Sequence, residues 1–328
     1  MQYLQLKGCY YEIGYAFGKS RRGIDTFSTP SDERMEFALK CEEELKDHAP
    51  DLHDELRGFS DGIGLDHDIV VATVLAPDML FECNLFFVRG ECTTNGHPIF
   101  VRHMDWTEES LKRLVMLESN PNGRHTSLGF NFADMGCFDG INEVGLAIGT
   151  ASVPFFTGKK NGVGLLENFS TRWSLDNFSK VEEVVDYLKN IPHTQAIIFL
   201  VADSTGTSAR VECSPMKVEA EIVNKDLNIV NNFFMLDDMK EHDGMPKDDR
   251  AYAYHNRIKE WFSQTGKRIT SDDIKRICRS HDSGICEHLY DPLGGTIYSW
   301  FSELDTDEIH LAIGYPCSNE YHTYRLGI

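Results

Sequence analysis

The stretch GECTTNGHPIFVRHMDW, residues 90–106, decides how this chain of 328 residues is interpreted. Its centre, Asn95-Gly96, is a strong signal for the tight turn of a β-hairpin. We therefore expect Cys92 to open one short strand and the returning strand to carry Arg102 and Asp105. Because a hairpin brings residues about ten positions apart into side-chain contact, the stretch predicts a thiol, a guanidinium and a carboxylate at one place.

These three groups together suit nucleophilic catalysis. The thiolate is the reactive form of cysteine, and a neighbouring guanidinium lowers the pKa of a thiol because it favours the charged state. Asp105 would anchor the arginine or accept a hydrogen bond from an amine. From the residues alone a second interpretation stays open, in which Cys92 is a small buried apolar residue and Arg102 and Asp105 form an ordinary ion pair.

Upstream of this stretch the chain is predicted to be mainly helical. Thr29-Pro30-Ser31-Asp32 has the capping hydroxyl, the proline at the first helical position and the acidic first turn of a helix start. Farther along, Ser179 and Glu182 have the spacing of a capping box, which opens a helix to about residue 190. Two more helices are expected at 248–263 and 271–281.

Short β-rich runs bounded by turn residues begin near Leu85. They lie at 99–103, 126–132, 136–141, 145–151, 196–202, 207–213, 216–224, 227–234, 295–302 and 308–314. The short connections between them favour antiparallel sheets with helices layered on top, which is the α+β class. A four-layer αββα sandwich fits this order, although the pattern alone does not single it out.

The formal charge of −20 argues against nucleic acid and anionic membranes as partners, because such a field repels phosphate groups. No apolar run approaches the ~18 residues of a membrane span, and the N-terminal residues lack the apolar core of a signal peptide. The nine cysteines contain no C-x-x-C pair, so they are expected to be reduced thiols. We therefore predict a cytoplasmic protein.

A metal-dependent hydrolase is an alternative, with His97, His103, His281 and His288 as candidate ligands. Neither an H-E-x-x-H motif nor a tight Cys/His cluster in the sequence accompanies these histidines. The sequence therefore predicts no metal and no cofactor.

Cys92-Thr93-Thr94, followed by VRHMDW at 101–106, resembles the nucleophile region of the acyl-coenzyme A:6-aminopenicillanic acid acyltransferase family. This peptidase C45-like family is related to the choloylglycine hydrolases. In it a Cys-Thr pair starts a strand, and a Gly/Val-Arg-Asn-x-Asp-aromatic segment follows. Here His103 replaces the asparagine, and the gap between the two motifs is short. Further segments resemble the family in the same order along the chain, at 8–14, 55–58, 139–147, 203–212, 231–234 and 249–250.

The resemblance implies the fold of the N-terminal nucleophile (Ntn) hydrolases, an αββα sandwich of two antiparallel sheets, here with a helical N-terminal segment. Cys92 would be the nucleophile and, after autocleavage of the Glu91–Cys92 bond, the N-terminal residue whose α-amine is the general base. Arg102 and Asp105 would hold the thiolate and the amine. The chain would divide into residues 1–91, a propeptide or small chain, and 92–328, the catalytic core. Glu91 departs from the glycine that precedes the cysteine in the family.

The resemblance also implies supporting residues. Asn232 matches the family asparagine whose side chain stabilises the oxyanion. Arg250 either supports the site or is an exposed arginine at a helix start, and Asn142 is expected to be a hairpin-turn residue rather than a catalyst. The second oxyanion donor would be a backbone N–H of Thr150, Ala151 or Ser152.

The implied function is hydrolysis of a linear amide or thioester, or acyl transfer from it, through an acyl-enzyme on the cysteine. Bile salts, penicillins, N-acyl amino acids and peptides all stay open as small-molecule substrates, and so does a homo-oligomer. The alternative is a catalytically silent binding protein on the same scaffold. Such a protein would have no need for Cys92, Arg102, Asp105 and Asn232 together.

Overall fold

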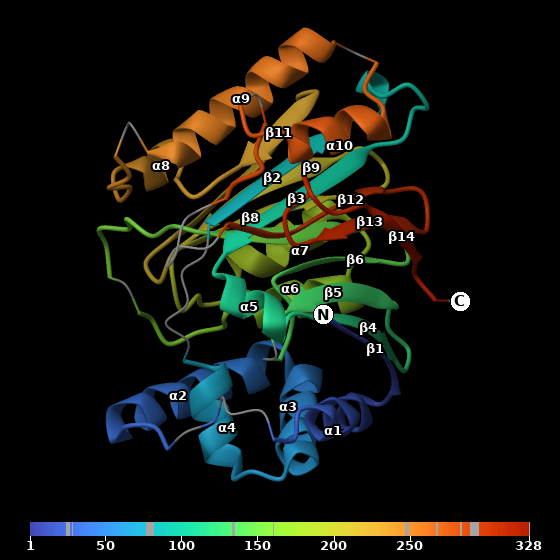
Figure 1. The fold of residues 1–328 in the computed structure, drawn as a ribbon. Helices are drawn as coiled ribbons and strands as arrows, with labels where there is room; N and C mark the ends of the chain where they lie inside the picture. Colours follow the sequence, from blue (N-terminus) through green and yellow to red (C-terminus); the bar gives the residue numbers. More distant parts are fainter. Residues whose placement is uncertain are drawn as a thin grey trace.

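Two packed β-sheets form the centre of the computed structural model, and helices cover their outer faces (Figure 1). The structure describes residues 1–327 except 24–26, 28, 77–81, 133–134, 160, 247–248, 267, 283 and 289–294. The predicted α+β class and the αββα layering are confirmed, and the N-terminal segment is mainly helical as expected.

The first sheet has eight strands, and its neighbours pair antiparallel except for the parallel pair at one edge, β1 with β4. In spatial order the strands are β1 (Gln2–Gly8), β4 (Val115–Pro121), β5 (Ser127–Asn131), β6 (Asp139–Asn142), β7 (Ala147–Ser152), β8 (Ile197–Ala202), β9 (Ser208–Cys213) and β10 (Val218–Ile222). The second sheet has six antiparallel strands. They are β11 (Leu227–Val230), β2 (Glu82–Val88), β3 (Ile99–Trp106), β12 (Gly295–Glu303), β13 (Glu308–Ile313) and β14 (His322–Arg325).

The helices begin where the sequence offers caps. Ser31 precedes the second helix and accepts a hydrogen bond from the Arg34 backbone, so the helix starts two residues later than predicted and Pro30 lies before the cap instead of at the first helical position. At the seventh helix the cap is shifted, because Glu183, not Glu182, accepts from the backbone of Ser179 and Lys180. The helices are α1 (Tyr10–Ser20), α2 (Asp32–His48), α3 (Pro50–Ile63), α4 (His67–Val74), α5 (Glu108–Arg113), α6 (Glu167–Asn177), α7 (Val181–Lys189), α8 (Asp237–Lys240), α9 (Arg250–Thr265) and α10 (Ser271–Arg279).

No helix within the described ranges combines the length and the hydrophobicity that crossing a bilayer requires.

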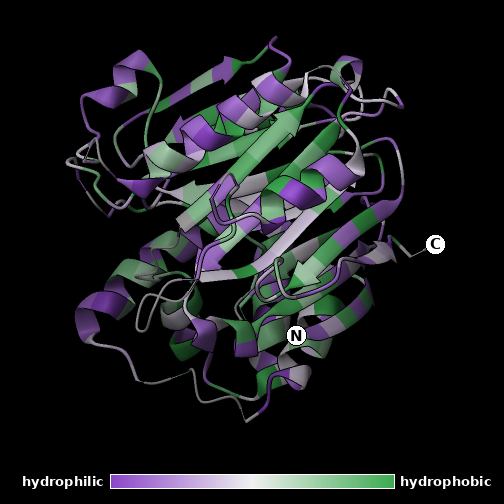
Figure 2. Ribbon diagram, turned by 45° about the horizontal axis from the view of Figure 1, so that its top comes forward, coloured by the Kyte–Doolittle hydropathy of each residue, from purple (hydrophilic) through white to green (hydrophobic). Residues whose placement is uncertain are grey.

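Alternation along β2 separates two layers of the core. Leu85 and Phe87 pack between the sheets, whereas Phe86 and Val88 pack against α9 and α10 on the outer face. Burying each such side chain contributes about 1.5–3 kcal/mol. Figure 2 shows the result as central strands that are mostly hydrophobic beneath helices of mixed character. Which layer a β2 residue enters is therefore set by whether its position is odd or even.

The N-terminal helices are fastened closely to the rest of the chain. In the contact between α1 and α3, a Cβ at Gly14 would lie 1.9 Å from the Glu55 carbonyl oxygen, so only glycine permits this approach. Arg172 on α6 pairs with buried Glu55 on α3. Strands β1 and β2 also belong to the two sheets. The core thus begins upstream of residue 92, and a boundary at residue 91 cuts through it.

Candidate active site

The β2–β3 hairpin brings a cysteine to Arg102, but the cysteine is Cys83. In the ladder Leu85 pairs with Arg102 and Cys83 pairs with Met104, so Cys83 and Arg102 are diagonal neighbours on the face between the sheets. The Cys83 Sγ lies 3.8 Å from the Met104 Sδ. The Arg102 Nη2 lies 3.3 Å from that Met104 Sδ. Thiol and guanidinium are therefore close together in a buried layer.

The structure does not bring Cys92 into this group, so the predicted constellation of Cys92, Arg102 and Asp105 is wrong. Cys92 ends a short 3-10 turn in the connection between β2 and β3, and its carbonyl accepts from Ile269 N at 2.9 Å. Its side chain packs in the outer layer with Phe86 and Val88. The ladder ends at Val88–Ile99, which leaves Arg102 about 10 Å farther along β3. The hairpin loop is longer than the two residues of the Asn95-Gly96 turn, which explains the error.

The surroundings of Cys83 act on its thiol in opposite directions. Burial raises the pKa of Cys83 to about 12, while the charge of Arg102 and a side-chain hydrogen bond with it act to lower that pKa. For Arg102, burial alone would lower the pKa, but the charges of Cys83 and Asp139 raise it. The guanidinium therefore stays charged beside the sulfur, and its Nη1 is buried without a hydrogen-bond partner.

Asp139, on β6 of the first sheet, holds the arginine in place. Its carboxylate accepts from Arg102 Nε at 2.9 Å and from the indole of Trp300 at 2.6 Å, and the Tyr298 hydroxyl also donates to it. All of these side chains are buried. Because a buried carboxylate with three donors is fully engaged, Arg102 is fixed across the interface of the two sheets.

Asn232 contacts the backbone nitrogen of Cys83. The Cys83 N–H donates to Asn232 Oδ1 at 2.8 Å, and Asn232 Nδ2 donates to the Ser152 carbonyl at 2.8 Å. One amide side chain thus joins the end of β7 to the residue that carries the thiol. Predicted Asn232 and Ser152 therefore both lie at the site, beside Cys83.

Asp105 lies on the other face of β3 and is held by a polar network. Its carboxylate accepts from Thr296 Oγ1 at 2.7 Å and from Asn84 Nδ2 at 3.3 Å. Asn84 in turn accepts from Asn231 Nδ2 at 2.7 Å. Asp105 is near enough for its charge to raise the pKa of Cys83. Arg102 and Asp105, the pair predicted from the sequence, thus lie near Cys83 on opposite faces of β3.

Comparison with known proteins assigns the chain to a family. The sequence profile of the acyl-coenzyme A:6-aminopenicillanic acid acyl-transferase family matches residues 92–317, more than half of the chain. The chain belongs to that family. It is thereby a member of a family of hydrolases and acyltransferases that act on amides. The match starts at Cys92, downstream of Cys83.

Solved structures establish the fold of this acyl-transferase family member. Penicillin V acylase from Agrobacterium tumefaciens superposes with a TM-score of 0.52 at 22% identity, over 74% of this chain and 86% of that one. The Caenorhabditis elegans N-acylethanolamine-hydrolyzing acid amidase ortholog superposes with a TM-score of 0.51 at 15% identity, over 75% of this chain and 100% of that one. Both have the Ntn-hydrolase fold. No curated protein sequence matches this chain.

The remaining predicted residues of this family member lie at different depths. Arg250 is half-buried at the start of α9. Its charge acts to lower the pKa of Tyr254, and the charge of Asp105 acts to raise the same pKa. Thr150 donates to the Phe138 carbonyl and Ala151 packs between the sheets. Asn142 is a turn residue as expected, since its Oδ1 accepts from the backbone of Val144 and Leu146.

Sequence reasoning missed Cys83, Asn84, Asn231 and Asp139. A signal for Cys83 was present, because only Asn84 separates it from the apolar run LFFV at 85–88, as expected for a cysteine near the start of a strand. The gap between Cys92 and Arg102 is also shorter than in the family, which favours a cysteine farther upstream. The expectation that no tight Cys/His cluster exists is wrong as well, since His281, Cys286, His288 and Cys317 lie together.

Proposed function

We propose that this chain is a cysteine Ntn amidohydrolase or acyltransferase whose nucleophile is Cys83. The observation that carries the proposal is the environment of that residue. Arg102 lies beside the thiol, and Asn232 holds the backbone nitrogen of the same cysteine. A nucleophile, a cation that favours its thiolate and a ligand for its nitrogen are the parts that an N-terminal cysteine nucleophile requires.

Maturation would break the Glu82–Cys83 peptide bond. The Cys83 sulfur attacks the carbonyl carbon of Glu82, the C–N bond breaks, and the thiol proton passes to the nitrogen, which becomes a free amine. Water then hydrolyses the resulting thioester and releases residues 1–82 from 83–328. Asn232 Oδ1 already accepts from this nitrogen, so it would retain the new amine in place.

Catalysis would use the same groups again. The α-amine, with an unperturbed pKa near ~8, takes the thiol proton and later gives it to the leaving amine. The thiolate attacks the substrate carbonyl and forms a thioester with the acyl group. Asn232 Nδ2, which donates to the Ser152 carbonyl in the uncleaved chain, would turn its donor to the oxyanion. Water or an acceptor amine completes the cycle.

Burial of the thiol supports the maturation step. Cys83 is 1% exposed in the uncleaved chain, so a dissolved substrate does not reach it there. The carbonyl of the preceding residue is the one that is always within reach. Cleavage before Cys83 would create the amine, and release of the chain upstream of it would open the sulfur to substrate.

Acyl-enzyme trapping tests the proposal. The protein is mixed with penicillin V or an N-acylethanolamine, the amides named for the two structural neighbours, then quenched in acid, digested and analysed by peptide mass. We expect a thioester on the Cys83 peptide that persists in Cys92→Ser. An adduct on the Cys92 peptide would contradict the assignment.

A second readout covers the case in which neither amide is the substrate. Limiting iodoacetamide should alkylate Cys83 of the matured protein faster than exposed Cys9. Slower alkylation of Cys83 than of Cys9 would favour the catalytically silent scaffold.

A further inference from the structure

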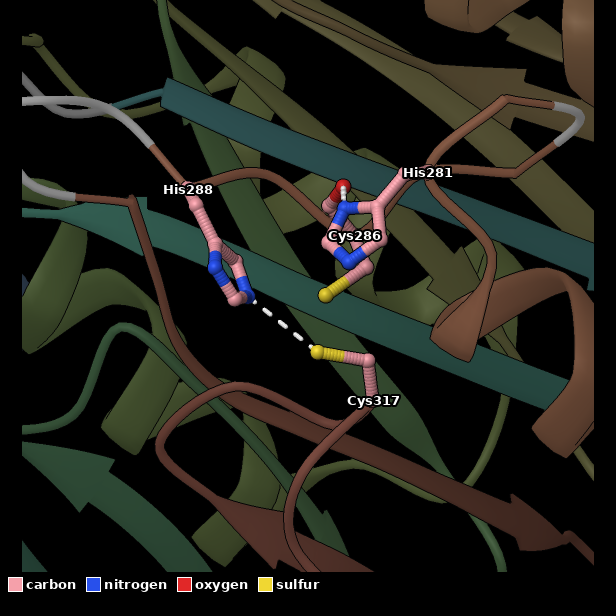
Figure 3. A group of neighbouring side chains, drawn as sticks. All are labelled: His281, Cys286, His288 and Cys317. Carbon is pink, nitrogen blue, oxygen red and sulfur yellow. Dashed lines mark hydrogen bonds between the residues drawn. The ribbon is translucent and has the colours of Figure 1, made fainter.

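Two cysteines and two histidines from separate segments converge near the C-terminus of the chain. His281 follows α10, Cys286 and His288 lie on the segment before β12, and Cys317 follows β13. Figure 3 shows the four side chains pointing toward one another. Their candidate ligand atoms all lie within 4.8 Å of one another.

The separations suit a tetrahedral metal. Zinc bonds of ~2.3 Å to sulfur and ~2.0–2.1 Å to nitrogen imply that ligand atoms lie roughly 3.3–3.8 Å apart. The His288 Nε2 and the Cys317 Sγ are 3.1 Å apart (Figure 3). The cluster therefore needs only small adjustments to enclose one ion.

The histidine rings are oriented as ligands require. His281 Nδ1 lies 2.9 Å from the Cys286 carbonyl, which can only accept, so Nδ1 carries the proton and Nε2 keeps a free lone pair. The His288 ring stacks on Tyr315 with centroids 3.8 Å apart and stands perpendicular to the His281 ring. Outer contacts of this kind fix the ligating nitrogen in zinc sites.

A second group of potential ligands has a simpler explanation. Glu42 Oε1 lies 2.7 Å from His67 Nε2 and 3.2 Å from His53 Nε2, so one carboxylate oxygen serves both rings. Ordinary hydrogen bonds account for this trio. In the four-residue cluster, by contrast, the His288–Cys317 hydrogen bond joins one thiol and one imidazole, and the ligand atoms of His281 and Cys286 lie at the same centre.

We propose that His281, Cys286, His288 and Cys317 form a structural zinc site. The two thiols release their protons to solvent on binding, so two thiolates balance the charge of Zn²⁺. Sulfur and imidazole ligands in a tetrahedron select zinc over magnesium or calcium. Four protein ligands close the coordination shell and leave no position for a catalytic water, which separates this site from a metal hydrolase.

The site would stabilise the support of Asp105. Glu287, between two of the ligands, donates its backbone N–H to Thr296 Oγ1 at 3.1 Å and accepts from Thr296 N at 3.0 Å. The same Thr296 hydroxyl donates to Asp105 at 2.7 Å. A metal that fixes residues 286–288 therefore also fixes the hydroxyl on this carboxylate.

Metal analysis tests the proposal on the full chain. Protein purified without chelators from zinc-supplemented cells is measured by elemental mass spectrometry against protein concentration. We expect one zinc per chain in the parent and less than about a tenth of that in Cys286→Ser and Cys317→Ser. The matched controls are Cys9→Ser, an exposed thiol elsewhere, and His53→Gln in the second group, and both should retain the parent zinc content.

A variant-free readout covers misfolding of the serine variants. Parent protein stripped of metal and titrated with Co²⁺ should develop thiolate-to-cobalt charge-transfer bands and tetrahedral d–d bands that saturate at one equivalent. A parent that binds no zinc or cobalt overturns the proposal. So does a Cys286–Cys317 disulfide in the unreduced peptide map, or zinc that persists in both serine variants.

Discussion

Cys83 and Cys92 are alike in sequence and differ in the structure. Each follows a glutamate, each belongs to the β2–β3 hairpin region, and each is buried. Cys83 faces the layer between the sheets, beside Arg102, and its nitrogen is held by Asn232. Cys92 lies in an apolar layer under α9 and α10. Burial alone therefore does not separate the two cysteines; the Cys83 nitrogen donates to the side chain of Asn232, whereas the Cys92 nitrogen donates to the backbone carbonyl of Arg89.

The balance of effects at Cys83 also explains why a precursor would be stable. In the uncleaved chain the effect of burial on the thiol pKa outweighs the effect of Arg102, because the pKa is raised to about 12. The thiol is thus protonated at neutral pH, and a base would have to remove its proton before it attacks a carbonyl.

The largest contrast is expected when each cysteine is replaced by alanine. Cys83→Ala should lower amide turnover at least about a thousandfold, because the covalent route is lost. Cys92→Ala should stay within a few-fold of the parent and lose only about 1–2 kcal/mol of unfolding free energy through a small cavity. Steady-state kinetics and urea unfolding on both variants measure this. Equal losses of activity would remove the distinction.

Arg102 extends the comparison to the charged partner. Arg102→Met should destabilise the fold by about 3–5 kcal/mol, because it removes one partner of a buried ion pair and leaves Asp139 without the other. The double variant with Asp139→Asn should recover part of this loss. Urea unfolding of the parent, both single variants and the double variant gives the coupling energy. Additive losses would mean that the two residues do not act as a pair.

A substitution at Asn232 distinguishes the two roles of its side-chain amide, in which Oδ1 accepts from the Cys83 nitrogen and Nδ2 donates. Asn232→Asp keeps an oxygen to accept from the Cys83 nitrogen but has no Nδ2 donor. We expect kcat to fall about 100- to 1000-fold while the thiol at Cys83 can still be alkylated. Rates of turnover and of alkylation are measured on the same preparation. An unchanged kcat would exclude this side chain from the oxyanion site.

The smallest effect is expected at His103, the family-divergent residue that pairs with Asn84 beside Cys83. Burial and the charge of Arg102 lower the pKa of His103 to about 3, so only the unfolded chain binds this proton between pH 6.5 and 3. The contribution of His103 is thus complete above pH 6.5 and is lost as the pH falls. Relative to His103→Asn, the parent should lose about 2 kcal/mol between pH 7 and 4.5. Parallel pH profiles of unfolding free energy would contradict the buried neutral imidazole.

Local signals in the sequence predicted much of the fold. The start of α2 was predicted to within two residues, with Ser31 as the capping hydroxyl, and the apolar run from Ile99 became β3. The short connections favoured antiparallel sheets, whereas the sandwich of two sheets was implied by the family resemblance. The capping glutamate of α7 was missed by one residue, because Glu182 and Glu183 both stand near the start and only backbone geometry selects between them.

The candidate site was predicted only in part, because it is assembled from both sheets. Arg102, Asp105 and Asn232 were identified by the resemblance, and all three lie around Cys83. Asp139 joins them across the interface between the sheets, which no spacing in the sequence reveals. Choosing between Cys83 and Cys92 required the ladder register, because one residue of slip on a strand reverses the face of every side chain.

Intact mass under denaturing conditions tests the central claim most directly, on the parent, Cys83→Ala and Cys92→Ala. We predict two species corresponding to residues 1–82 and 83–328 in the parent and in Cys92→Ala, and one full-length species in Cys83→Ala. Fragments 1–91 and 92–328, or a full-length Cys92→Ala chain beside a cleaved Cys83→Ala chain, would return the nucleophile to Cys92 and contradict the account.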